Sequence, residues 1–128
     1  MLKADRLDAQ VSCLDQAYET VRNHSALYEQ GQKDGVKNTC LDLSDVLFCL
    51  NRHGLGYASV IQESNSHLVV RIQQCRECER QSPGCGCSYI AGFLAGALRA
   101  MGKPATLSVH EVSCGEGSSP SCVFMASW

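Results

Sequence analysis

Residues 88–101 read SYIAGFLAGALRAM and separate two pairs of strand-like segments in the sequence. Apolar side chains recur at spacings of three and four from Ile90 to Met101, which predicts a helix with a buried face. Gly92 and Gly96 lie four residues apart on this helix, and small residues at that spacing let another backbone approach closely. The Gly-Lys-Pro sequence that follows predicts where the helix ends.

The segments on either side of this helix have strand composition. Residues 57–63 and 67–73 are rich in β-branched residues and flank a short polar turn, which predicts a β-hairpin. Residues 105–112 and 121–125 form a second such pair around a turn rich in glycine, serine and proline. Two hairpins indicate an antiparallel sheet of four strands.

Two helices are predicted before the first hairpin. Residues 5–37 carry apolar side chains at helical spacing, and we expect Gly31 and Gly35 to weaken or break this helix. Residues 42–53 carry a second apolar stripe, and the glycines after them are typical of a helix C-terminus. The order is therefore α-α-β-β-α-β-β. We expect residues 1–128 to form one α+β domain, with helices packed on one face of an antiparallel four-stranded sheet.

Composition limits the class of protein. A chain of 128 residues with 45% apolar and 19% charged residues has enough apolar surface for a packed core. A net charge of −2 without a run of Lys or Arg argues against a dedicated nucleic-acid binder. Residues 1–8 do not resemble a secretory signal, and no apolar stretch approaches the length of a membrane helix. We therefore expect a cytoplasmic protein without a membrane span.

Nine cysteines are the most unusual feature of the composition. Because the cytoplasm keeps thiols reduced, clustered cysteines there indicate metal or redox chemistry more often than disulfides. Cys13, Cys40 and Cys49 are isolated from one another, and we interpret them as small apolar residues that pack on helices. The other six lie within residues 75–87 or near the C-terminus.

Glu111, Cys114 and Cys122 predict a metal site. Two thiols and a carboxylate gather there at one turn between strands, and Zn²⁺ accepts both kinds of donor in a tetrahedron. Cys87 is the natural fourth ligand, because it precedes a helix and a helix N-terminus favours a thiolate. Residues three apart on a strand point to opposite faces, so Glu111 and Cys114 can share a metal only if the strand bends or ends between them, and Gly115 and Gly117 favour such a departure. The alternative for Glu111 is a solvated acid at a strand end.

Cys75 and Cys78 form a separate Cys-x2-Cys pair. The loop-like sequence that follows argues against thioredoxin-type chemistry, which needs this pair at the start of a helix. A zinc ribbon would need a second Cys-x2-Cys pair downstream, and the sequence has none. The sequence leaves three interpretations of this pair, namely a bound metal, a disulfide or two exposed thiols.

Three motifs within residues 75–128 carry a resemblance to a known family. They are Cys87-x4-Gly92-Phe93-x-Ala95-Gly96, Gly102-Lys103-Pro104 and Glu111-x2-Cys114-x7-Cys122-x-Phe124. Together they resemble the 4-vinyl reductase domain, which occurs as small standalone proteins and as the sensor part of phenol- and xylene-responsive regulators. That domain is similar in fold to trafficking subunits of the transport-protein-particle complex and to haem-based nitric-oxide sensors.

The resemblance also implies a ligand set for the metal. It implies a structural zinc ion with four protein ligands, Cys87, Glu111, Cys114 and Cys122. Cys85 is close enough to Cys87 in the sequence to take its place. Standalone relatives often carry a pair like Cys75 and Cys78, so these two are reserve ligands.

The function implied by the resemblance is small-molecule binding. The sheet and helices would enclose an apolar pocket for a small apolar or aromatic ligand, and a sensor-type domain would pass its signal to a signalling or operon partner. A reductase or accessory subunit in tetrapyrrole vinyl reduction is an alternative. We favour a protein that is not an enzyme, because the sequence has no recognisable nicotinamide or flavin motif and no catalytic residue. A protein–protein assembly module is the third possibility, with a homodimer formed through the long N-terminal helix.

Overall fold

The computed structural model describes residues 24–38, 40–77, 87–114 and 121–128. Its elements, in chain order, are α2 (His24–Lys37), α3 (Leu43–Arg52), β1 (Tyr57–Glu63), β2 (His67–Gln73), α5 (Ser88–Ala100), β3 (Ser108–Cys114) and β4 (Ser121–Ser127). This order confirms the predicted α-α-β-β-α-β-β arrangement and the α+β class. The part of the first predicted helix before residue 24, with Cys13, lies outside the described residues. None of the described helices is long and apolar enough to cross a membrane.

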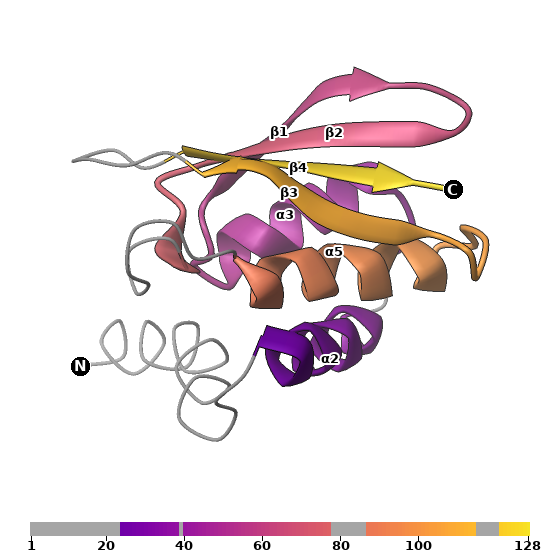
Figure 1. Ribbon diagram of the computed structural model, residues 1–128, viewed down its shortest axis with the longest axis horizontal. Helices are drawn as coiled ribbons and strands as arrows, with labels where there is room; N and C mark the ends of the chain where they lie inside the picture. Colours follow the sequence, from indigo (N-terminus) through magenta and orange to yellow (C-terminus); the bar gives the residue numbers. More distant parts are fainter. Residues whose placement is uncertain (1–23, 39, 78–86, 115–120) are drawn as a thin grey trace.

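The four strands form one antiparallel sheet in the order β1-β2-β4-β3. The bounds of β1 and β2 are those predicted from the sequence. The last strand, β4, lies between β2 and β3, so it pairs with both hairpins. Figure 1 shows the sheet as one layer, with the three helices on the same side of it.

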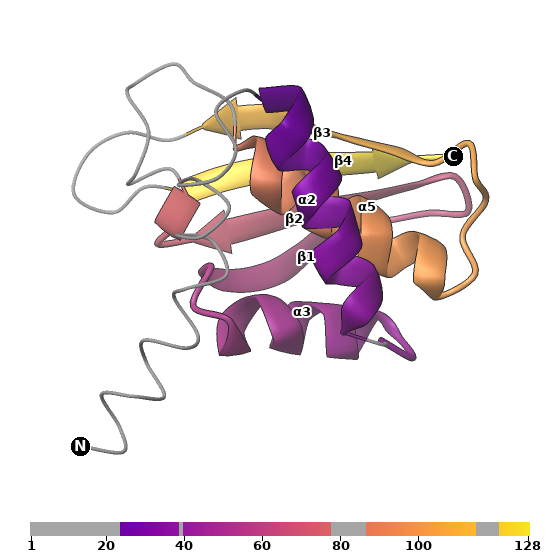
Figure 2. The ribbon, with the colours of Figure 1, turned by 90° about the horizontal axis from the view of Figure 1, so that it is seen from below.

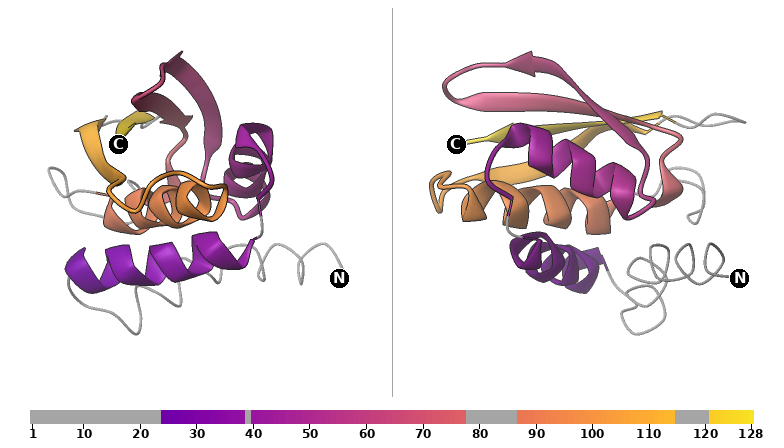
Figure 3. Two further views of the ribbon diagram at one scale, coloured as in Figure 1. Left: turned by 90° about the vertical axis from the view of Figure 1, so that its right-hand side faces the viewer. Right: turned by 180° about the vertical axis from the view of Figure 1, so that it is seen from behind.

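α5 lies between the sheet and α2, so it is covered on two sides (Figures 1 and 3). All residues from Tyr89 to Leu98 are buried as a result. The two central strands supply the facing side chains, which are Leu68, Val70 and Ile72 from β2 and Cys122, Phe124 and Ala126 from β4. The core therefore lies between α5 and the middle of the sheet, and α3 covers it on the β1 side.

Four glycines form the contact between α2 and α5, which cross in Figure 2. Gly31 and Gly35 of α2 pack against the α5 backbone, and Gly92 and Gly96 of α5 pack against the α2 backbone. A Cβ at any of the four would lie 2.0 to 2.3 Å from a carbonyl oxygen of the facing helix. The close approach predicted for Gly92 and Gly96 is thus confirmed. The prediction that Gly31 and Gly35 break the helix is wrong, because close helix packing offsets their low helix propensity of about 1 kcal/mol each.

The second hairpin differs from its predicted bounds at both ends. β3 begins at Ser108, three residues later than predicted, because the chain still turns where Leu107 N–H donates to Pro104 O (3.0 Å). β3 then runs on to Cys114, and β4 continues two residues beyond its predicted end. The additional pairing at this end of β3 matters for the site described next.

Candidate metal centre

Three segments meet at one end of the sheet, and each contributes a buried cysteine. Cys75 follows the end of β2, Cys122 lies near the start of β4, and Cys87 immediately precedes α5. β2 and β4 are neighbours, with Ile72 opposite Cys122, which brings Cys75 towards the start of β4. The site therefore joins both hairpins to the N-terminus of α5.

The three sulfur atoms lie at the spacing of metal ligands. All three Sγ atoms fall within 4.8 Å of one another. The Sγ atom of Cys87 is 3.8 Å from that of Cys122 and 3.8 Å from that of Cys75. A disulfide would need about 2.05 Å. A tetrahedral zinc ion with Zn–S bonds of about 2.3 Å has sulfur–sulfur edges of about 3.8 Å, so the residues fit the ion.

Glu111 contacts the backbone of Cys87 and has one buried oxygen without a hydrogen-bond partner among the described residues. Its Oε1 accepts a hydrogen bond from the backbone N–H of Cys87 at 3.3 Å. Its Oε2 is buried and has no hydrogen-bond partner among the described residues. A solvated acid at a strand end would keep both oxygens in water, so that alternative does not describe Glu111. Among the described residues, the group of ligand atoms that lie within 4.8 Å of one another contains the three sulfur atoms and neither oxygen of Glu111.

A β-bulge in β3 solves the geometric problem posed by the spacing of Glu111 and Cys114. The register of β3 shifts at Val112, so Glu111 stands opposite Phe124 and Cys114 stands opposite Cys122. Both partners on β4 are buried. The strand therefore departs from regular geometry at Val112, between the two residues, as a shared site requires, and the glycines after Cys114 lie outside the described residues. The side chain of Cys114 lies outside the described part of the structure.

The predicted site residues thus have different outcomes. Cys87 and Cys122 lie together in the cluster, whereas Glu111 contacts only the backbone N–H of Cys87 and does not belong to the group of three sulfur atoms, so the predicted ligand set stays a prediction. The third thiol of the cluster is Cys75, which the sequence offered only as a reserve ligand. Two further reserve residues, Cys78 and Cys85, lie outside the described residues.

Local backbone geometry places Cys75 in the cluster. Gln74 has a φ of +54°, a left-handed conformation that is uncommon for a residue with a side chain. The chain leaves β2 at this residue, and Arg76 N–H then donates to Leu55 O at 2.9 Å. Gly56 packs against the same turn, where a Cβ would lie 2.9 Å from Gln73 O. The loop after α3 therefore supports the segment that carries Cys75.

Electrostatics at the cluster favour neutral thiols unless a cation is present. Contact with the Cys122 and Cys75 thiols, followed by burial, raises the pKa of the Cys87 thiol above its ordinary value. The buried carboxylate of Glu77 contributes in the same direction. A divalent cation reverses this balance, because it stabilises the thiolates that bind it.

Sequence reasoning missed Glu77. Its side chain is buried between the segments of Cys75 and Cys87 and accepts hydrogen bonds from the first turn of α5. A lone glutamate inside a Cys-x2-Cys pair carries no local signal of that role.

A second pair of buried thiols lies on the α3 side of the molecule. The Sγ atoms of Cys40 and Cys49 are 3.7 Å apart. Burial, followed by contact with Cys49, raises the pKa of Cys40 to about 12. Both residues pack in the core, as predicted, although Cys40 precedes α3 and does not lie on a helix.

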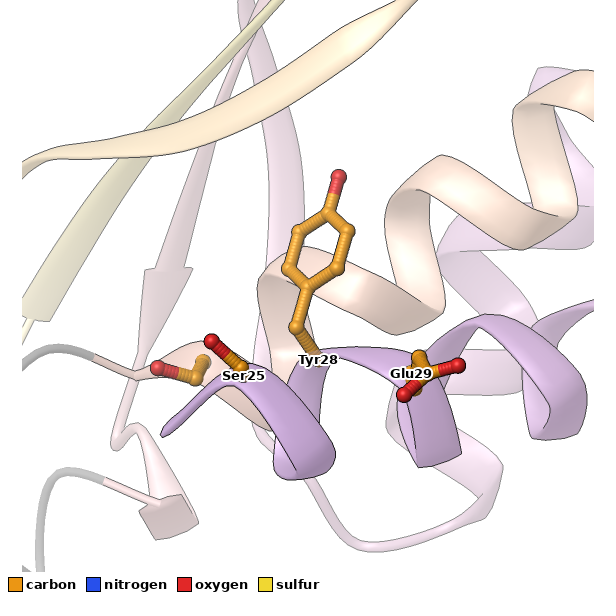
Figure 4. A pocket seen from close by; sticks show the side chains of 4 residues that line it. Ser25, Tyr28 and Glu29 are labelled. Atoms are coloured by element: carbon orange, nitrogen blue, oxygen red, sulfur yellow. The ribbon is translucent and has the colours of Figure 1, made fainter. Parts of the chain in front are cut away.

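A shallow depression of about 500 Å³ lies at the N-terminal ends of α2 and α5. Ser25, Tyr28 and Glu29 of α2 line it (Figure 4), together with Ser88 of α5. The Tyr28 ring points away from α2 along the start of α5. Ser88 directly follows Cys87 of the thiol cluster in the sequence. The apolar pocket expected between the sheet and the helices stays a prediction.

Comparison with solved structures identifies the fold. A vinyl-4-reductase family protein from Methanocaldococcus jannaschii superimposes with a TM-score of 0.62, at 22% sequence identity, over 78% of this chain and 66% of that chain. The chain has a vinyl-4-reductase-like fold. This likeness confirms the resemblance noted in the sequence, and the chain spans slightly less than two thirds of that protein's length. No protein-family model and no curated protein sequence matches the chain.

Proposed function

We propose that this chain is a cytoplasmic small-molecule-binding, sensor-type domain whose hairpins are tied to α5 by a structural zinc ion. The proposed ligands are Cys75, Cys87 and Cys122, with Glu111 in the fourth position. Cys114 is the competitor for that fourth position, because it stands opposite Cys122 in the register of β3 and β4.

One observation supports the metal above all others, namely two sulfur–sulfur distances of 3.8 Å within a buried group of three thiols. The buried oxygen of Glu111, which has no hydrogen-bond partner in the described part of the chain, is a donor of the type that zinc accepts. Four protein ligands leave no position for an activated water, so the proposed role of the ion is structural. Thiolate ligands also fit a reducing, cytoplasmic location.

Elemental analysis tests the metal directly. Protein purified without chelator should contain one zinc per chain. Replacement of zinc by Co²⁺ should give sulfur-to-metal charge-transfer absorption whose intensity corresponds to three thiolates, or to four if Cys114 binds. Protein that folds, contains no metal and takes up none from added Zn²⁺ would contradict the proposal.

Ligand binding is supported by the fold and by the depression beside Tyr28. The depression offers an aromatic wall together with two hydroxyl groups, which suits a small aromatic molecule with a polar substituent. Phenol and benzene are suitable probes, observed by ligand-detected NMR against wild type and Tyr28→Ala. We expect phenol to bind to wild type and to bind more weakly to the variant. Equal signals for both proteins would place the ligand elsewhere, and no signal at millimolar phenol would count against a phenol sensor.

Assembly is a second candidate function, favoured by exposed apolar side chains around α3. Leu41 is 81% exposed and Phe48 is 63% exposed, and a large apolar side chain in water favours association. Light scattering with size-exclusion chromatography should show a dimer for wild type and a monomer for Phe48→Ser. A monomeric wild type at high micromolar concentration would contradict self-association.

A further inference from the structure

Glu77 is a charged side chain with an exposed fraction of 0%. It lies between Cys75 and Cys87 in the sequence. Its Oε2 accepts a hydrogen bond from Tyr89 N–H and its Oε1 accepts one from Ile90 N–H, both at 2.8 Å. These two amides belong to the first turn of α5, where backbone N–H groups have no acceptor within the helix.

The Glu77 carboxylate takes the place of an ordinary helix cap. Cys87 occupies the N-cap position of α5, and its side chain makes no capping hydrogen bond. The positive end of the helix dipole and two charge-assisted hydrogen bonds stabilise the carboxylate, which offsets the cost of burying its charge. Glu77 thereby fixes the point at which α5 begins.

This cap also joins the segments that carry two of the thiols. Glu77 follows Cys75 by two residues, and Tyr89 follows Cys87 by two residues. The hydrogen bonds between them tie both short segments together at the site where the two Sγ atoms are 3.8 Å apart. That distance is about the edge of a zinc–sulfur tetrahedron.

We propose that Glu77 is a positioning residue of the metal centre, which holds Cys75 and Cys87 at ligand spacing before a metal binds. This inference rests on the metal site of the proposed function. Glu77 is treated as a positioning residue and not as a ligand, because its oxygens accept helix amides and do not belong to the group of ligand atoms formed by the three thiols. Its role is to order the two thiols in advance, so that less conformational entropy is lost when the metal binds.

Metal affinity is the first test. Glu77→Gln keeps the size of the side chain but places an amide donor where the helix needs an acceptor. We expect the variant to bind one Zn²⁺ about 10- to 100-fold more weakly than wild type, in competition with a chromophoric chelator. Leu98→Ala is the matched control, because it truncates a buried residue towards the other end of α5 and should cost about 2–5 kcal/mol without changing zinc affinity. An affinity loss no larger than that of the control overturns the proposal.

Thiol cross-linking in metal-free protein is the second test and does not depend on the metal. A short bifunctional thiol reagent should join Cys75 to Cys87 in wild type and in Leu98→Ala, with a several-fold lower yield in Glu77→Gln, as measured by peptide mapping. Equal yields in all three proteins overturn the positioning role. If wild type binds no metal, the proposed zinc site is wrong. The cross-linking yields still test the positioning role of Glu77 in that case.

Glu77→Asp serves if Glu77→Gln fails to fold. It keeps the charge but shortens the side chain by one methylene, so it reaches the helix amides less well. Zinc affinity and cross-link yield should then both lie below wild type. Wild-type values for both measurements overturn the proposal.

Discussion

The molecule contains two groups of buried thiols that have nearly the same sulfur spacing and different surroundings. The pair Cys87 and Cys122 is separated by 3.8 Å, and the pair Cys40 and Cys49 by 3.7 Å. The first pair has a third thiol and a helix N-terminus beside it, and the Cys87 backbone donates to Glu111, whose other oxygen is buried without a partner among the described residues. The second pair lies on α3 and the residues before it, where exposed Asp42 caps the helix.

The two groups are expected to differ in metal binding because sulfur spacing alone does not supply enough donors for a zinc ion. Zinc in a structural site needs four donors, and two buried thiols without further buried donors leave half of its coordination empty. At Cys40, burial and the neighbouring thiol keep the sulfur protonated. We therefore expect zinc at the first group and plain apolar packing at the second.

Matched serine substitutions should give the largest effect. Cys122→Ser removes a ligand, so we expect loss of the bound zinc and a decrease in the free energy of unfolding of more than about 4 kcal/mol, as metal loss typically causes. Cys49→Ser buries a similar hydroxyl in the second group and should cost about 1–3 kcal/mol. Chemical unfolding with and without chelator measures both.

The chelator separates the effects on metal and on packing. It should lower the stability of wild type and of Cys49→Ser by similar amounts and leave Cys122→Ser unchanged. Equal stability losses from the two substitutions, with zinc retained in both, would mean that the two groups do not differ in the way we propose.

Carboxylate substitutions should have a smaller effect than the cysteine substitutions, and we expect them to change only the affinity for Zn²⁺. Glu111→Gln weakens the fourth donor, and we expect the affinity for Zn²⁺ to fall about 10- to 100-fold while one ion still binds. Asp45→Asn is the control at the second group, where Asp45 accepts a hydrogen bond from Leu41 N–H at 2.9 Å. It should leave the affinity unchanged. Wild-type affinity in Glu111→Gln together with a loss in Cys114→Ser would assign the fourth position to Cys114.

The elements that depend on local sequence were predictable. The first hairpin and α5 follow from the spacing of apolar residues, and their bounds agree with the prediction to within a residue. Cys87 and Cys122 were predictable because one precedes a helix and the other begins a strand after a turn. The hairpin, the helix and the places of these two cysteines are determined by residues that are close together in the sequence.

The rest of the site depends on contacts between distant segments. Cys75 joins the cluster because β2 lies next to β4, and the strand order is not encoded in either strand alone. Glu77 caps a helix that begins eleven positions further along the chain. The bulge at Val112 depends on the pairing of β3 with β4, and the segment that contains it has the sequence of a regular strand. The close packing of α2 on α5 likewise outweighs the low helix propensity of Gly31.

The smallest effect at neutral pH concerns Cys40 and appears only in alkali. Its thiol has a pKa raised from 9.0 to about 12 in the folded protein, so the unfolded chain loses this proton at lower pH than the folded one. The contribution of this thiol to stability is therefore complete below about pH 9 and is lost progressively as the pH rises towards 12. A zinc-bound thiolate behaves in the opposite way, since protons compete with the metal in acid.

Cys40→Ala isolates this effect. The difference in free energy of unfolding between wild type and Cys40→Ala should be constant from pH 7 to 8.5 and should shrink steadily at higher pH. The difference in free energy of unfolding between wild type and Cys122→Ser should not decrease above pH 8.5, because that difference comes from bound metal. Urea unfolding at several pH values measures both, and parallel curves for wild type and Cys40→Ala would show that the second group does not keep its thiol protonated.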